Sequence, residues 1–159
     1  MDVQSYGEGV QFSQLKPGDC FLFSIHNKNE FGISIRSENK TMLIFIFDKP
    51  GGHQVPRVTS DGYPYQLLRI LSPILRPDPK SLHFNSPTIG ELISGGGKFY
   101  LKGCDARTRE EWTANLKEGV RETIPEGLLV VSYSRWSVGH ILDGVWISIF
   151  DFDSAVNRG

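Results

Sequence analysis

Residues 15–48 read LKPGDCFLFSIHNKNEFGISIRSENKTMLIFIFD and contain three strand-like runs separated by two polar turns. In the first two runs apolar residues alternate with others, which is the two-residue period of a strand with one buried face. The third run, residues 42–47, is apolar at every position, so we expect a central strand covered on both faces. Pro17 and Gly18 before the first run predict a tight turn.

Further along the chain, two segments match helix signals. Thr88 and Glu91 have the spacing of a capping box, which predicts a short helix over residues 89–94. A longer surface helix is predicted to begin at Asp105 or Thr108, because Thr108 and Glu111 repeat that spacing. Its narrow apolar stripe recurs every four residues: Trp112, Leu116 and Val120.

Three more strands are predicted at residues 98–102, 128–133 and 145–152, with Asp143-Gly144 as a hairpin turn before the last. The expected fold is therefore α+β: a mainly antiparallel, strongly curved sheet or partly open barrel of six to seven strands, with one surface helix and one short helix. We expect a single domain over residues 1–159. The proline-rich residues 72–87 could form an extended crossing between its two halves.

Composition narrows the class of protein. The chain has 159 residues, of which 39% are hydrophobic, enough for a core without disulfide staples. A net charge of −1 and scattered basic residues argue against nucleic-acid binding. The apolar runs are too short to cross a membrane. Two distant cysteines and a polar start after Met1 predict a cytoplasmic protein with reduced thiols.

Cys104 is the strongest candidate nucleophile, because it precedes the predicted long helix, whose N-terminus would favour a thiolate. It would still need a histidine from another segment: His26, His53, His83 or His140. The alternative interpretation is a small residue packed in or near the core, and we favour it.

Other chemical motifs are weaker. Asp143, Asp151 and Asp153 could converge on a cation, but carboxylates flanking an edge strand more often protect that edge. The glycines of residues 95–97 and Lys98 lack the full spacing of a phosphate loop, so we interpret them as a helix C-cap. We therefore predict no metal and no cofactor.

The candidate binding residues are Arg135, Trp136, His140 and Asp143, where aromatic and charged side chains meet near a predicted turn. Arginine and tryptophan are enriched at the energetic centres of protein interfaces. His140 and Asp143 could form a carboxylate-oriented imidazole, or a loop capped by its own side chains. Trp136 could equally pack into the core.

The segment that begins Lys16-Pro17-Gly18-Asp19, continues through Phe31-Gly32 and ends at Phe47-Asp48 resembles the N-terminal signature of bacterial immunity proteins of the immunity protein 26 type. The resemblance covers about a quarter of the chain. It implies a protein that neutralises a cognate toxin by binding it, with no catalytic residues.

The sequence therefore predicts a non-catalytic protein-binding module, an immunity or inhibitor protein whose partner could be a toxin domain. The alternative is a small hydrolase or transferase that uses Cys104 with a histidine. A third function, reception of a small ligand, would require a pocket inside the curved sheet.

Overall fold

The computed structural model describes residues 7–25, 28–37, 42–48, 55–59, 66–105 and 107–154. Almost all regular structure in these ranges is β. The helices described are two 3-10 turns of three residues, Phe12–Gln14 and Pro79–Ser81. The strands are β1 Gly7–Val10, β2 Cys20–Ile25, β3 Lys28–Arg36, β4 Met42–Asp48, β5 Val55–Thr59, β6 Leu67–Ile70, β7 Ile74–Pro77, β8 Leu82–His83, β9 Leu92–Gly95, β10 Lys98–Asp105, β11 Glu111–Asn115, β12 Val120–Arg121, β13 Val131–Tyr133, β14 Arg135–Leu142 and β15 Val145–Asp153.

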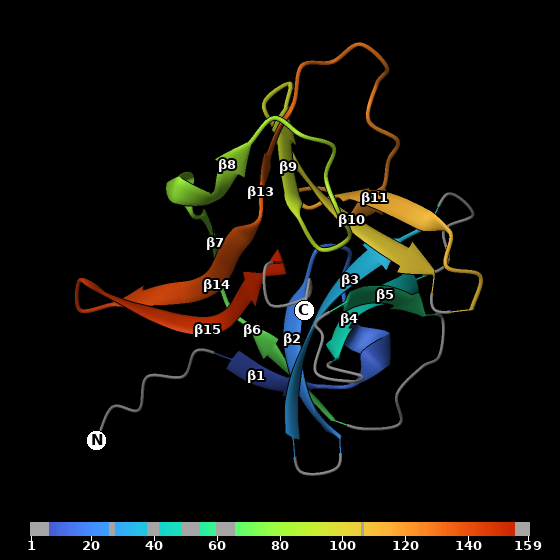
Figure 1. Ribbon diagram of the computed structural model, residues 1–159. Helices are drawn as coiled ribbons and strands as arrows, with labels where there is room; N and C mark the ends of the chain where they lie inside the picture. The colour runs from blue at the N-terminus through green and yellow to red at the C-terminus, as the bar shows by residue number, and fades with distance from the viewer. Residues whose placement is uncertain are drawn as a thin grey trace.

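The strands form two sheets (Figure 1). The larger sheet is an open path in the order β1-β6-β2-β3-β12-β11-β10-β9-β13-β8, and β4 and β5 form a branch that joins β3 to β10. Pairing is antiparallel except between β5 and β10 and between β12 and β3. The smaller sheet has the order β15-β14-β7, and its hairpin of β14 and β15 projects to one side of the molecule.

The tight turn at Pro17-Gly18 has the predicted geometry and anchors the larger sheet. Gly18 has φ +88°, as the third residue of a type II turn requires, and the Asp19 amide donates to the Lys16 carbonyl at 3.1 Å. Ser34, fully buried on β3, closes the turn from the other side: its amide donates to the Asp19 carbonyl at 2.9 Å, and its hydroxyl donates to the Lys16 carbonyl. The turn is therefore locked to the centre of β3.

An aromatic cluster joins the two sheets. Phe31 of β3 stacks on Phe150 of β15 with ring centroids 4.4 Å apart, and Trp136 of β14 stacks on Phe152 at 5.5 Å. Phe47 of β4 contacts Trp136, Phe150 and Phe152. All five rings are at most 9% exposed. Burial of aromatic rings of this size dominates core energetics, so this cluster fixes the root of the projecting hairpin.

The predicted long helix is wrong: residues 111–115 are strand β11, antiparallel to β10. Trp112 and Ala114 are buried while Glu111 is exposed, which is the two-residue period of a strand. The four-residue recurrence of Trp112, Leu116 and Val120 misled the prediction, because residues four apart share a face of a strand as well as of a helix. The Asp105 carboxylate does accept the amides of Arg107 and Thr108, at 2.8 and 2.9 Å, but in a turn between two strands.

The predicted short helix over residues 89–94 is also wrong. Thr88 and Glu91 do interact, through the Thr88 hydroxyl and Glu91 Oε1 at 3.0 Å, but they enclose a turn in which Gly90 has φ +92°. A right-handed helix cannot continue through that conformation, and the chain enters β9 instead. Gly96 and Gly97, interpreted as part of a helix C-cap, form a hairpin turn between β9 and β10 with φ +59° and +76°.

The predicted α+β fold class is therefore wrong: the fold is mostly β, and its main sheet is open and larger than the predicted one. The strands predicted at residues 98–102 and 145–152 are confirmed by β10 and β15, and Asp143-Gly144 is the hairpin turn. Strand β14 was missed, because a register shift between Val138 and Gly139 interrupts its alternation. The side chains of residues 42–46 lie outside the described part of the structure, so the prediction of a strand covered on both faces stays a prediction.

Gly119 provides a test of the locked turn. A Cβ at Gly119, where φ is +64°, would overlap the backbone of Pro17 and Gly18. Gly119→Ala should therefore cost the left-handed strain of about 1–2 kcal/mol plus about 1–3 kcal/mol of overpacking in urea unfolding.

Gly127→Ala is the matched control, because φ is +81° there and no heavy atom lies within 4 Å of the added Cβ. Its free energy of unfolding should fall by the cost of the left-handed strain alone. Equal losses in the two variants would contradict the close packing of the turn against Gly119.

Candidate functional site

The projecting end of the β14–β15 hairpin exposes apolar side chains on both faces. Residues that pair directly across an antiparallel ladder share a face. Leu142 with Val145 and His140 with Ile147 therefore lie on one face, and Ile141 with Trp146 on the other. We call the hairpin surface the set Ile74, Ile141, Leu142, Val145, Trp146 and Ile147.

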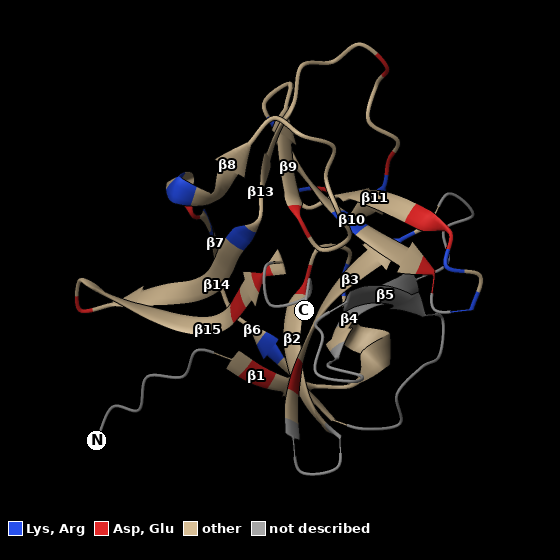
Figure 2. Ribbon diagram, viewed as in Figure 1, with Lys and Arg blue, Asp and Glu red and all other residues tan. Residues whose placement is uncertain are grey.

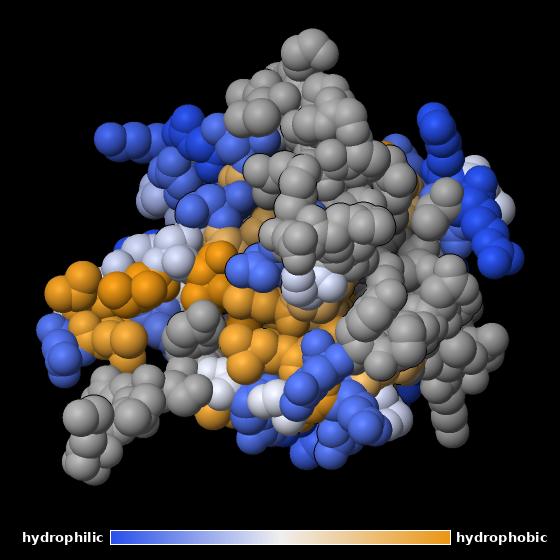
Figure 3. Space-filling view, turned by 90° about the horizontal axis from the view of Figure 1, so that it is seen from below, coloured by the Kyte–Doolittle hydropathy of each residue, from blue (hydrophilic) through white to orange (hydrophobic). Residues whose placement is uncertain are grey.

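The exposure of this surface is unusual for a strand pair. Val145 is 59% exposed, Ile141 52% and Ile147 44%. Apolar atoms gather over this end of the molecule in the space-filling view (Figure 3), and charges on it are few (Figure 2). A contiguous exposed apolar area of this kind marks interaction sites in soluble proteins.

The hairpin surface is held in shape by local contacts. The guanidinium of Arg76 on β7 lies over the Trp146 ring, 4.2 Å from its centroid, a cation–π contact. A side chain at Gly139 would overlap the Ile147 carbonyl and lie 2.9 Å from a Trp146 ring carbon, so glycine permits the close approach of the indole. Eight cross-strand pairs support β14 along its length. The surface is therefore presented by a pre-formed element.

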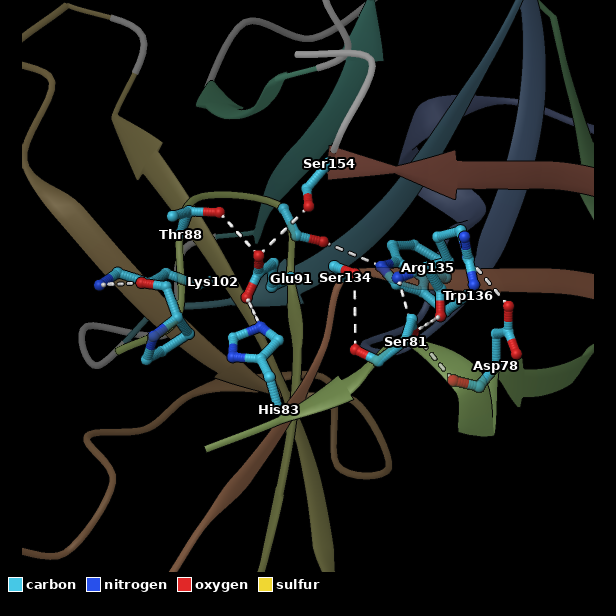
Figure 4. A network of polar contacts seen from close by, with 12 residues as sticks. Asp78, Ser81, His83, Thr88, Glu91, Lys102, Ser134, Arg135, Trp136 and Ser154 are labelled. Carbon is cyan, nitrogen blue, oxygen red and sulfur yellow. Dashed lines mark hydrogen bonds and ion pairs between the residues drawn. The ribbon is translucent and has the colours of Figure 1, made fainter. Parts of the chain in front are cut away.

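A second region with functional chemistry surrounds the buried carboxylate of Glu91 (Figure 4). Glu91 is fully buried; its Oε2 lies 2.7 Å from His83 Nε2, and its Oε1 accepts from the hydroxyls of Thr88 at 3.0 Å and Ser154 at 3.2 Å. A buried carboxylate persists only when it is paired and hydrogen-bonded. No sequence motif predicts this pair, because His83 and Glu91 come together through the pairing of β8, β13 and β9.

The candidate binding residues lie at two ends of β14. Arg135 and Trp136 begin the strand, and His140 and Asp143 lie toward its tip. Arg135 and Leu142 are seven residue steps apart along the extended strand, about 23 Å. The four therefore do not form one cluster.

Their environments differ as well. Trp136 is 2% exposed and donates its Nε1–H to the Gly90 carbonyl at 2.9 Å, so it belongs to the aromatic core. Arg135 Nε donates to Asp78 Oδ2 at 2.9 Å. Hydrogen bonds from the Lys80 amide and from Arg135 lower the pKa of Asp78. Arg135 and Trp136 both line an open groove of about 530 Å³ at the junction of β7, β14 and β15.

Cys104 lies buried on β10, and the predicted helix after it is absent, so no helix terminus stabilises its thiolate. Burial, with the charge of Asp19, raises the pKa of Cys20 to about 12. Among the residues described, no three His, Cys, Asp or Glu side chains gather in a way that could hold a metal. Within those same ranges no helix has the length and apolarity to span a membrane.

No protein-family model matches the chain, and no curated protein or solved structure matches it either. The hairpin surface and the region around Glu91 are therefore the features that can indicate a function.

The buried Glu91 pair can be tested by removing the carboxylate. Glu91→Ala leaves His83 and two hydroxyls without their acceptor, so we expect a loss of at least about 2 kcal/mol in the free energy of unfolding by urea. Glu111→Ala is the control: Glu111 is 57% exposed and pairs with Lys102, so its loss should cost less than about 1 kcal/mol. Similar losses at both positions would show that the pair is not important for stability.

The burial of both cysteines predicts slow thiol chemistry in the native protein. With a pKa of about 12, only about one Cys20 in ten thousand is a thiolate at pH 8. An aromatic disulfide reagent should therefore label the native protein far more slowly than the protein in guanidinium, where both thiols should react. Rapid stoichiometric labelling of Cys104 in the native state, located by peptide mapping, would contradict this expectation.

Proposed function

We propose that the protein is a non-catalytic module that binds another protein through the hairpin surface. The observation that carries the proposal is the exposure of apolar side chains on both faces of one projecting, pre-formed hairpin. Complete burial of a valine or isoleucine side chain is worth about 1.5–3 kcal/mol. Covering three side chains that are about half exposed would therefore contribute substantially to binding.

The shape and charge of the hairpin favour one kind of partner surface. A convex, two-faced apolar end fits a groove that contacts both faces, which a folded protein domain can supply. Asp143 stands exposed at the tip, and Asp151 is exposed farther along β15. We therefore propose a partner whose apolar groove has basic residues at its rim, since complementary charge raises the association rate and fixes the register.

The resemblance of the N-terminal segment to immunity proteins supports one class of partner, a toxin domain. In that role the hairpin would occupy a groove of the toxin and block its activity by steric exclusion. We also propose a cytoplasmic location, a compartment in which buried thiols such as those of Cys20 and Cys104 stay reduced.

Mutation of the hairpin tests the proposal. The partner is isolated with the tagged protein, purified, and titrated in a calorimeter. Ile147→Asp should weaken the complex at least about tenfold, because it places a charge in an apolar contact. Asp143→Asn should slow association while preserving the turn, because asparagine tolerates the positive φ of this position.

The matched control is Leu129→Asp, which makes the same kind of change at a residue that is 93% exposed and outside the hairpin. It should bind as the wild type does. Capture of a protein alone does not support the proposal: a complex that tolerates Ile147→Asp as well as Leu129→Asp would overturn it. A purified partner with toxin activity that the wild type inhibits, and Ile147→Asp does not, would support the immunity role.

A further inference from the structure

A small polar pocket lies where β8 and the preceding 3-10 turn meet the start of β14. Its volume is about 300 Å³, and its lining is Lys80, Ser81, Leu82, His83, Asn85, Ser86, Ser134 and Arg135. Every lining residue except Leu82 is polar, and none is an aspartate or a glutamate. This size is at the lower end of small-ligand sites.

The charges at this pocket favour an anion. Lys80 is exposed, and among the described residues no carboxylate lies within ion-pairing distance of its Nζ. Arg135 also lines the pocket, but its Nε is ion-paired with Asp78 Oδ2 at 2.9 Å, so Lys80 is the main source of charge. The Glu91 carboxylate already interacts with His83, whose Nε2 lies within hydrogen-bond distance of it (Figure 4). The accessible charge at the pocket is therefore positive.

Neutral hydrogen-bond donors complete the lining. The Ser81 hydroxyl is already engaged: it donates to the Asp78 carbonyl at 2.8 Å and accepts from the Arg135 amide at 3.0 Å. The Ser134 hydroxyl makes only a long contact of 3.5 Å to the Ser81 carbonyl. Asn85 and Ser86 are exposed and line the pocket, and both side chains carry hydrogen-bond donors.

We propose that this pocket binds a tetrahedral oxyanion of the phosphate class. Lys80 supplies the charge, Asn85 and Ser86 supply donors, and Arg135 and Ser134 close the opposite side. Hydrogen bonds from charged donors to phosphate oxygens are the strongest that proteins make in such sites. The site is separate from the hairpin surface and does not depend on the protein-binding function.

Calorimetric titration with sodium phosphate at constant ionic strength tests the site. The full-length protein should bind one phosphate per chain saturably, and sodium chloride should give no such signal. Lys80→Gln should weaken binding at least about tenfold, and Ser86→Ala several-fold. These side chains are exposed, so the variants should remain folded, as circular dichroism can verify.

Lys117→Gln is the matched control, because it removes the same charge from an exposed position outside the pocket. It should bind phosphate as the wild type does, and so should the hairpin variant Ile147→Asp. No saturation up to about 10 mM phosphate would overturn the proposal, since the dissociation constant would then lie above the millimolar range. Equal weakening by Lys80→Gln and Lys117→Gln would also overturn it.

A parallel titration with a sugar monophosphate identifies the source of the oxyanion. Tighter binding than that of inorganic phosphate would assign the pocket to phosphomonoesters. Equal affinity would assign it to the free anion.

Discussion

The aromatic cluster between the two sheets is the contact on which the rest of the structure depends. Phe31 and Phe47 come from the larger sheet, and Trp136, Phe150 and Phe152 come from the β14–β15 hairpin. These rings bury the root of the hairpin, whereas beyond the register shift at Val138 and Gly139 no third strand among the described residues pairs with residues 140–142. The apolar exposure of the hairpin surface follows directly from this geometry.

The hairpin surface and the polar pocket lie on different parts of β14 and would bind their partners through different interactions. The tip of β14 offers convex apolar surface, whose binding energy would come from release of water. The start of β14 offers a concave polar pocket, whose binding energy would come from charge and directed hydrogen bonds. Arg135 lines both the pocket and the groove that contains Asp78, while Trp136 beside it is buried in the core and lines the groove.

The two wrong helix predictions have two local causes. Capping residues form hydrogen bonds in turns as readily as at helix ends: the Asp105 carboxylate accepts the Arg107 amide, and the Thr88 hydroxyl donates to the Glu91 carboxylate. A stripe with four-residue spacing, such as Trp112 and Leu116, fits a strand as well as a helix. The alternation that would have decided between them is only five residues long in β11, too short to outweigh the caps.

The sequence by itself determined the local features: the Pro17-Gly18 turn, the strands at β10 and β15, and the Asp143-Gly144 hairpin. Each depends on the period or on the conformational preference of adjacent residues. Only the tertiary structure decided that Trp136 is core while Ile147 is exposed, and that His83 lies against Glu91. Burial and long-range pairing depend on which strands become neighbours. The pairing of strands from distant parts of the chain has no local sequence pattern that predicts it.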